Sequence, residues 1–362
     1  MTMNAPKIVS VLLPVLALLA ACDKPAGEHT NAPTVAATNK VDPVAPAPQV
    51  GFFEAKAVDT AAFAPLTPLS TDRTPSVLRA QILLDRAQFR PGVIDGRYGE
   101  NVRQAVAAFE EANGLTVDGQ LDQAVFDKLT SLDARPVLTQ YTIAEADVAG
   151  PFIDSVPKDV EAQSKLPAMS YTSAAELLGE KFHMTEDLLK ALNPGVDLTK
   201  AGQTITVADL GANALPSPVA SIVVDKAESA VKAYDAAGKL LAFYPATIGS
   251  EEMATPDGVL KVSGVSKHPT YTFDPARLTY KGPKTKTVVA AGPNNPVGVV
   301  WIGLNKPTYG IHGAPDPALI GKRESHGCVR LTNWDALELA AAVKPGVQVK
   351  FTGGDSSAAK PT

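Results

Sequence analysis

Between residues 219 and 353, short runs of alternating apolar and polar residues follow one another, and this pattern limits the region to a mostly-β fold. The predicted strands are 221–224, 230–234, 240–248, 259–265, 299–304 and 347–351. Only one good helix is predicted, from Asn333 to Val343. Thr332 can cap its first turn, with Asp335 three residues further on, as in a capping box. We therefore expect a mostly-β domain with one main helix over 219–353.

Residues 74–132 carry a helical period instead, which predicts a small domain of three helices. Thr74 and Pro75 are typical of a helix N-cap followed by proline in the first turn. Two Asp-Gly turns, Asp95-Gly96 and Asp118-Gly119, each precede a predicted helix. The apolar residues with helical spacing are Val102, Ala105, Val106, Phe109, Ala112, Val125, Leu129 and Leu132.

A second small unit, of α+β type, is predicted over 169–210, behind a proline-containing connecting segment at 133–168. Apolar residues between Ala175 and Leu192 indicate two short helices, and Asn193-Pro194-Gly195 ends the second. The alternation in 203–207 predicts a strand. The expected order in this unit is strand, helix, helix, strand, so the whole chain is expected to be multidomain.

The N-terminus is typical of an export signal, which we assign to residues 1–21. Lys7 precedes the apolar run from Ile8 to Ala20, which is shorter than the about 20 residues that cross a bilayer. Residues 22–73 are rich in Ala, Pro and Thr and cannot bury enough surface to offset their ordering entropy. We expect an extended tether there and a flexible tail at 354–362.

Charge and hydropathy exclude some classes of partner. The net charge of −5 gives no support for binding to nucleic acid. No second long apolar run follows the signal, so any membrane contact is expected to come through the N-terminus.

Two histidines and one thiol fall within seventeen positions near the C-terminus, at His312, His326 and Cys328. The chain has one other cysteine, Cys22, which directly follows the signal. Oxidising compartments pair or damage thiols, so a single thiol in an exported domain needs a reason to be there. The most economical reason is that Cys328 is a nucleophile.

A cysteine nucleophile needs a base, because a thiol with the ordinary pKa of about 8.5 is mostly protonated at neutral pH. A neighbouring imidazole can take the proton and leave an ion pair. His326 lies two residues before Cys328 and would share its face in an extended chain, whereas His312 could lie on an adjacent strand. The sequence alone does not choose between the two histidines.

Other residues near Cys328 fit further catalytic tasks. Gly327 and Cys328 can present backbone N–H groups to an oxyanion, and Ser325 can orient an imidazole. Arg330 can bind a substrate carboxylate through its planar guanidinium. A metal site is a poorer interpretation, because two histidines and one cysteine give three ligands and no carboxylate sits at tight spacing.

These motifs resemble those of known families of cell-wall enzymes. The region 219–353 resembles an L,D-transpeptidase catalytic domain of the YkuD type, through Thr255-Pro256-Asp257-Gly258, Gly292-Pro293-Asn294-Asn295-Pro296, Ile311-His312-Gly313 and Ser325-His326-Gly327-Cys328-Val329-Arg330. The region 74–132 resembles a peptidoglycan-binding module, and 169–210 resembles a LysM domain, which binds glycan. Leu19-Ala20-Ala21-Cys22 resembles a lipoprotein lipobox.

The catalytic resemblance implies acyl transfer on peptidoglycan. It implies that Cys328 attacks the carbonyl between the third residue of a tetrapeptide stem and its terminal D-alanine, so that D-alanine leaves and a thioester remains. It makes His312 the proton acceptor and donor, lets His326 shape the site, and puts Gly313 and Arg330 at the substrate. An amine then resolves the thioester, from a neighbouring stem, a free D-amino acid or the lysine of a wall-linked lipoprotein. No metal or diffusible cofactor is implied.

The lipobox implies lipidation of Cys22 and a periplasmic protein anchored to a membrane, and Asp23 resembles an inner-membrane retention signal. Three alternatives remain open at this point. Water could resolve the thioester, which would make the protein an L,D-carboxypeptidase or amidase. The catalytic domain could be inactive in a lipoprotein that tethers membrane to wall. The third alternative is a metal-dependent peptidase.

Overall fold

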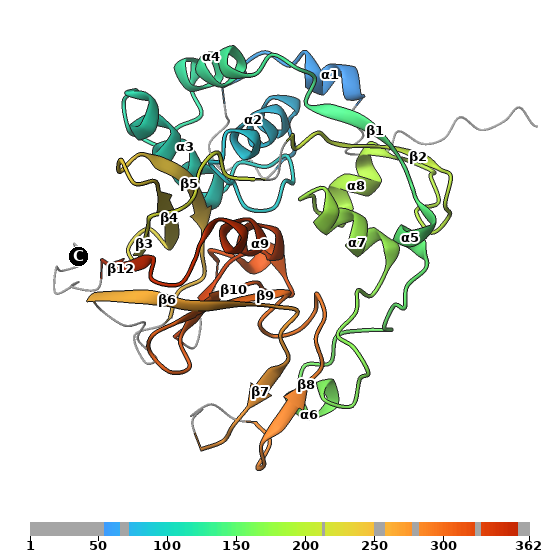
Figure 1. Ribbon diagram of the computed structural model, residues 1–362. Helices are drawn as coiled ribbons and strands as arrows, with labels where there is room; N and C mark the ends of the chain where they lie inside the picture. Colours follow the sequence, from blue (N-terminus) through green and yellow to red (C-terminus); the bar gives the residue numbers. More distant parts are fainter. Residues whose placement is uncertain are drawn as a thin grey trace, which may run out of the picture. The chain divides into compact units, whose positions relative to one another are not determined.

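The computed structural model describes residues 54–65, 72–211, 214–249, 258–276, 282–322 and 327–353 (Figure 1). The expected signal at 1–21, the lipidation residue Cys22 and the tail at 354–362 lie outside these residues, as does most of the expected tether. No helix among the described residues has both the length and the apolar character needed to cross a membrane.

The described part of the chain contains helices in its first half and mostly strands in its second half (Figure 1). The helices are α1 (Ala55–Asp59), α2 (Pro75–Arg86), α3 (Glu100–Asn113), α4 (Gln123–Leu132), α5 (Glu145–Val148), α6 (Val160–Gln163), α7 (Ala174–Lys181), α8 (Glu186–Leu192), the short 3₁₀ helix η1 (Pro317–Leu319) and α9 (Asn333–Ala342). The strands are β1 (Leu138–Thr142), β2 (Thr204–Ala208), β3 (Ser221–Asp225), β4 (Ala230–Tyr234), β5 (Leu240–Pro245), β6 (Gly258–Lys267), β7 (Tyr271–Phe273), β8 (Thr287–Val289), β9 (Val300–Leu304), β10 (Gly310–His312), β11 (Val329–Arg330) and β12 (Gln348–Thr352).

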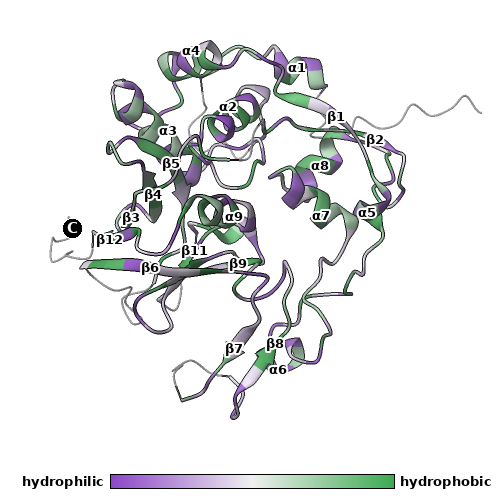
Figure 2. Cartoon of the chain, viewed as in Figure 1, coloured by the Kyte–Doolittle hydropathy of each residue, from purple (hydrophilic) through white to green (hydrophobic). Residues whose placement is uncertain are grey.

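The expected three-helix unit, residues 74–132, forms from α2, α3 and α4, and we call it the helical unit. The Thr74 hydroxyl accepts the Val77 N–H at 3.3 Å, with Pro75 in the first turn, as the sequence predicts. Figure 2 shows both polar and apolar residues along α3 and α4, as expected of helices that bury one face.

The expected tether does not extend to residue 73 as a structureless segment, because α1 lies within it. Val58 of this helix is fully buried in the core of the helical unit. The Asp59 carboxylate accepts the backbone N–H groups of Val137 and Leu138, at 2.7 and 3.1 Å. One buried apolar side chain and one carboxylate therefore hold this stretch, although its composition favours disorder.

The second unit begins earlier than the sequence suggests. Its first strand, β1, lies in the segment expected to be a connection, and it pairs antiparallel with β2. The two main helices, α7 and α8, have N-caps at Ser173 and Thr185. We call residues 138–208 the central unit. It shares a continuous apolar core with the helical unit, so these two units are packed together.

The β domain, residues 219–353, is built on an eight-stranded sheet with the order β11-β10-β9-β6-β12-β3-β4-β5. Its pairs are antiparallel except β10 with β11 and β12 with β3. Helix α9 contacts β9 and β10 (Figure 1). The sequence predicted β3, β4, β5, β6, β9, β12 and α9 to within a few residues. It did not predict the short strands β7, β8, β10 and β11.

The helical unit is joined to the β domain at the edge of this sheet. Residues Gln88 to Arg90 run beside β5, where the Gln88 carbonyl accepts the Phe243 N–H and the Phe243 carbonyl accepts the Arg90 N–H, both at 2.9 Å. An edge strand presents unpaired backbone groups, and this segment pairs some of those on β5.

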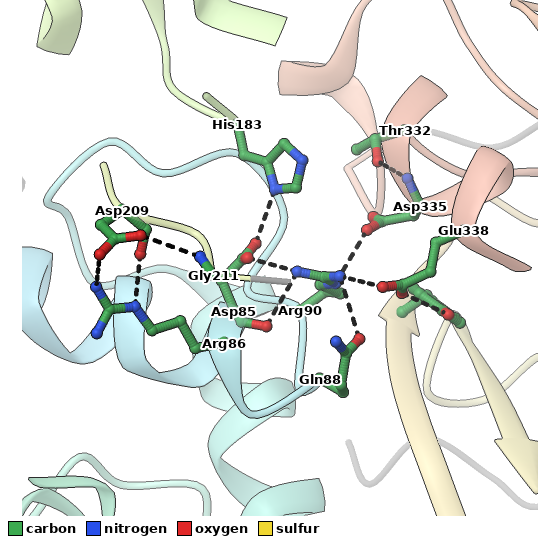
Figure 3. A network of polar contacts seen from close by, with 11 residues as sticks. Asp85, Arg86, Gln88, Arg90, His183, Asp209, Gly211, Thr332, Asp335 and Glu338 are labelled. Atoms are coloured by element: carbon green, nitrogen blue, oxygen red, sulfur yellow. Dashed lines mark hydrogen bonds and ion pairs between the residues drawn. The ribbon is translucent and has the colours of Figure 1, made fainter. Parts of the chain in front are cut away.

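A buried ion cluster lies at the same junction (Figure 3). Arg90, which is 1% exposed, contacts Asp85 of α2 and both Asp335 (3.5 Å) and Glu338 (2.6 Å) of α9. His183 of the central unit contacts Asp85 at 3.1 Å. Burial raises the pKa of Asp335 to about 7, with the charge of Arg90 opposing it. Arg90 thus joins the helical unit to the β domain, and Asp85 joins the central unit to the same cluster.

Replacing Arg90 by methionine is expected to lower the free energy of unfolding by about 3–5 kcal/mol, because buried carboxylates would lose their cation. Chemical denaturation measures this change. Arg86→Met is the matched control, because Arg86 is as buried but its partners Asp133 and Asp209 are 19% and 36% exposed to water. Equal losses in the two variants would contradict a special role for the cluster.

Candidate active site

The two shortest strands of the sheet bring the distant sequence motifs together. β10 and β11 pair in parallel, with Ile311 opposite Val329 and His312 opposite Arg330. Ile311 and Val329 are buried in the apolar core. Because side chains alternate along a strand, His312 and Arg330 face the other side of the sheet, and so does Cys328, two residues before Arg330.

A cavity of about 560 Å³ lies on that face. His312, Cys328 and Arg330 all line it, together with Trp301 of β9 and Thr308. Residues on or beside the β7–β8 hairpin line it as well, namely Tyr271, Asp274 and Lys286. Among the described residues, the walls of this cavity carry the Cys328 thiol, the His312 imidazole, the cations Lys286 and Arg330 and the Asp274 carboxylate.

The surroundings of His312 favour its neutral form. Its Nδ1 lies 2.6 Å from the Gly313 carbonyl, which can only accept, so Nδ1 carries the proton and Nε2 keeps a lone pair. Burial, together with the charge of Arg330, lowers the pKa of His312 to about 3, although the hydrogen bond to Gly313 acts in the opposite direction. Trp301 stacks on the imidazole with ring centroids 5.2 Å apart and planes 14° apart.

Cys328 is held as a protonated thiol. Burial raises its pKa above the ordinary value, although a backbone hydrogen bond from Gly310 and the charge of Arg330 act in the opposite direction. The thiol donates to the Thr308 carbonyl at 3.5 Å. Thr308 has φ of 69°, a conformation that a β-branched residue rarely adopts. A thiol beside a neutral imidazole, not the ion pair considered from the sequence, is the resting state that these surroundings favour.

Gly313 and Gly327 are two of the other candidate residues that the structure describes. Gly327 has φ of 105°, which favours glycine at this position. The Gly313 carbonyl accepts from His312, and a Cβ on Gly313 would overlap the side chain of Asn333 in α9. Ser325 and His326 lie outside the described residues, so nothing is added here to their expected roles.

Arg330 has a buried Nε for which the described residues provide no hydrogen-bond acceptor. A buried donor of this kind costs free energy unless a partner arrives. Its guanidinium lines the cavity, where a carboxylate could supply that partner.

Trp301 and Thr308 are site residues that the sequence analysis did not find. Trp301 lines the cavity because it alternates with the buried Val300 and Ile302 along β9. That alternation was visible in the sequence and could have identified it. Thr308 acts through its backbone carbonyl, for which the sequence carries no signal. Among the described residues, no three His, Cys, Asp or Glu side chains group in a way that could hold a metal ion.

Two segments of the chain match known protein families. Residues 220–350 match the family model of the L,D-transpeptidase catalytic domain, YkuD, and residues 73–129 match that of a peptidoglycan binding domain. A protein of Bacillus licheniformis named "Putative L,D-transpeptidase YkuD" is 29% identical over 180 residues, 49% of this chain and 92% of that protein. YbiS of Escherichia coli K12, named as a probable L,D-transpeptidase, is 32% identical over 187 residues, 50% of this chain and 60% of that protein.

Among solved structures, L,D-transpeptidase 3 from Mycobacterium tuberculosis aligns over 42% of this chain and 75% of that one, at 17% identity and a TM-score of 0.32. A similarity this low carries no argument. The sequence matches identify residues 220–350 as an L,D-transpeptidase catalytic domain, which is that of a cysteine-dependent transferase acting on peptidoglycan. A peptidoglycan-binding domain precedes it in the chain.

Proposed function

We propose that the whole protein is an L,D-transpeptidase in which Cys328 is acylated by a peptidoglycan stem tetrapeptide and an amine then accepts the acyl group. The observation that carries this proposal is the shared cavity, lined by a thiol, a neutral imidazole and an arginine from adjacent parallel strands. The match of residues 220–350 to the catalytic-domain family supports it.

Acylation requires the thiol proton to move as the sulfur attacks. We infer that Nε2 of His312 takes this proton while sulfur bonds to the carbonyl between the third stem residue and D-alanine. The N–H groups of Gly327 and Cys328 stabilise the oxyanion. The imidazolium then gives the proton to the departing D-alanine amine as the C–N bond breaks, which leaves a thioester and a neutral His312.

Transfer to the acceptor reverses these proton movements. The acceptor amine attacks the thioester carbonyl, His312 removes a proton from that nitrogen, and the C–S bond breaks. The sulfur leaves as a thiolate and recovers the proton from the imidazolium, so the enzyme returns to its starting state. In this scheme Ser325 and His326 shape and orient the site.

Arg330 and Gly313 are proposed to contact the donor peptide. The buried Nε of Arg330, with no acceptor among the described residues, supports a role in binding a stem carboxylate. Gly313 follows His312, and its carbonyl accepts the hydrogen bond from the imidazole. A substrate that contacts Gly313 would therefore also affect the position of His312.

The remaining units are proposed to keep the enzyme at its substrate. The central unit has the strand–helix–helix–strand order of a LysM domain, with α5 and α6 inserted after the first strand, and a glycan contact would fit that resemblance. Lipidation of Cys22 would anchor the protein in the periplasm, at the inner membrane if Asp23 acts as a retention signal. A wall-linked lipoprotein is one acceptor that this location would offer.

Mass spectrometry of muropeptides tests the reaction. The protein lacking residues 1–22 is incubated with disaccharide tetrapeptide, with and without a D-amino acid as acceptor. We expect products that have lost D-alanine and gained the acceptor, and no reaction of disaccharide tripeptide, which lacks the D-alanine leaving group. Tripeptide as the product even with excess acceptor would identify a hydrolase, and an unchanged donor would support the inactive tether.

A further inference from the structure

The loop between β10 and β11 meets the N-terminal end of α3 in the helical unit. This loop follows His312 and leads to Cys328, so its path affects where the two groups lie. Asn101, in the first turn of α3, donates from Nδ2 to the Ile320 carbonyl at 2.9 Å. Asn101 is 8% exposed, so the hydrogen bond is made largely out of water, where it contributes more than at a surface.

Two glycines enclose the Asn101 amide. Gly92 and Gly321 have φ of 75° and 74°, which favour glycine. A Cβ on Gly92 would lie 2.8 Å from Nδ2 of Asn101, and one on Gly321 would overlap Oδ1. The amide therefore fits closely against both the helical unit and the loop of the β domain.

The loop is tied in turn to the strand that carries the catalytic residues. The Gly321 N–H donates to the Thr247 hydroxyl at 3.0 Å. Thr247 and Arg330 exchange two backbone hydrogen bonds, each 2.9 Å. A continuous series of polar contacts thus leads from Asn101, through residues 320 and 321 and Thr247, to Arg330 on β11, two residues from Cys328.

We propose that Asn101 is a positioning residue of the active site, through which the peptidoglycan-binding domain fixes the loop that carries the nucleophile. Residues 319–321 are held from one side by Thr247 and from the other by Asn101. Without the amide, the loop loses this hydrogen bond to the helical unit and samples positions in which Cys328 and His312 are misaligned. Small displacements of the reacting groups lower the rate of acylation strongly, whereas they change the affinity for the acyl donor little. The inference rests on the proposed acylation of Cys328.

The test compares Asn101→Ala with wild type and with Asn113→Ala. Asn113 lies on the same helix, and its Nδ2 also donates to a backbone carbonyl, that of Phe109 at 2.8 Å, but within the helix itself. Both variants therefore lose a side-chain amide, but only Asn101→Ala also loses a hydrogen bond to the loop. A carbapenem serves as acyl donor, and the adduct on Cys328 is followed by intact mass over a range of donor concentrations.

Asn101→Ala is expected to lower the maximal acylation rate about tenfold while the half-saturating concentration stays unchanged. Asn113→Ala is expected to acylate like wild type. The same tenfold loss in both variants, or a loss that appears only as weaker binding, would overturn the positioning role. Thr247 holds the same loop. Thr247→Val should therefore lower the acylation rate by a smaller factor in the Asn101→Ala variant than in wild type.

Hydrogen exchange separates failure of this inference from failure of the proposed function. Peptides covering 314–331 should exchange faster in Asn101→Ala than in wild type or Asn113→Ala, whether or not the protein is acylated. If wild type is not acylated but the loop exchanges faster in Asn101→Ala, the anchoring stands and the proposed reaction fails. If exchange of the loop is unchanged, the positioning role is wrong even when wild type is active.

Discussion

Cys328→Ser is expected to reduce release of D-alanine from tetrapeptide stems by at least about 10⁴-fold, because loss of a nucleophile removes the covalent pathway as a whole. His312, with its pKa near 3, is a base too weak to activate a hydroxyl, so serine cannot replace the thiol. Amino-acid analysis of released D-alanine measures the change. The fold should survive, because only one atom of the side chain changes.

Binding of the donor provides the control for this variant. Cys328→Ser should retain the affinity of wild type for tetrapeptide, because Arg330 and the rest of the cavity are unchanged. Normal turnover by Cys328→Ser would exclude the thioester route. Loss of affinity together with turnover would show that the substitution had disturbed the cavity and would leave the nucleophile to be tested with Cys328→Ala.

The strands that form the main body of the β domain could be predicted because each is long enough to show alternation. β3, β4 and β12 have five residues each, and β12 alternates strictly between polar and apolar residues. β10 and β11 have three and two residues, too few for any period to be visible. These two strands nevertheless position the site, and the sequence identified their residues by chemical motif and not as strands.

Contacts between the units could not be predicted from the sequence. Arg90 stands in a turn between two helices, where an arginine is ordinarily exposed, yet it is buried among carboxylates from two units. Asp335 illustrates the same limit. The Thr332 hydroxyl caps α9 as predicted, accepting the Asp335 N–H at 3.1 Å, but the Asp335 carboxylate lies by Arg90. A partner far along the chain leaves no local pattern.

The candidate residues of the site were visible as a motif, but their protonation states were not. A histidine near a cysteine suggests an ion pair, whereas desolvation lowers the pKa of His312 and raises that of Cys328, which favours the neutral form of each. Burial depends on the packing of strands and on the rest of the cavity wall, Trp301 included. The pH dependence of the reaction therefore follows from the structure alone.

His312→Ala is expected to slow acylation of Cys328 by about 10²–10⁴-fold at neutral pH, because no base would remain to take the thiol proton in the transition state. In wild type the pKa of His312 is lowered to about 3, so the imidazole is almost wholly neutral at mildly acidic pH and above. The maximal acylation rate should therefore stay nearly constant from mildly acidic to mildly alkaline pH. The intact-mass assay with a carbapenem measures this rate.

The variant should behave differently, because only thiolate formed by solvent could react. Since burial raises the pKa of Cys328, the thiolate fraction below that pKa grows about tenfold with each pH unit, and the rate of His312→Ala should grow with it. The ratio of the acylation rate of wild type to that of His312→Ala should therefore fall as pH rises. A wild-type rate that itself grew tenfold per unit would exclude His312 as the base. If that steep dependence appeared in His326→Ala and not in His312→Ala, the base would be His326, and the neutral imidazole of His312 would act only on the shape of the cavity.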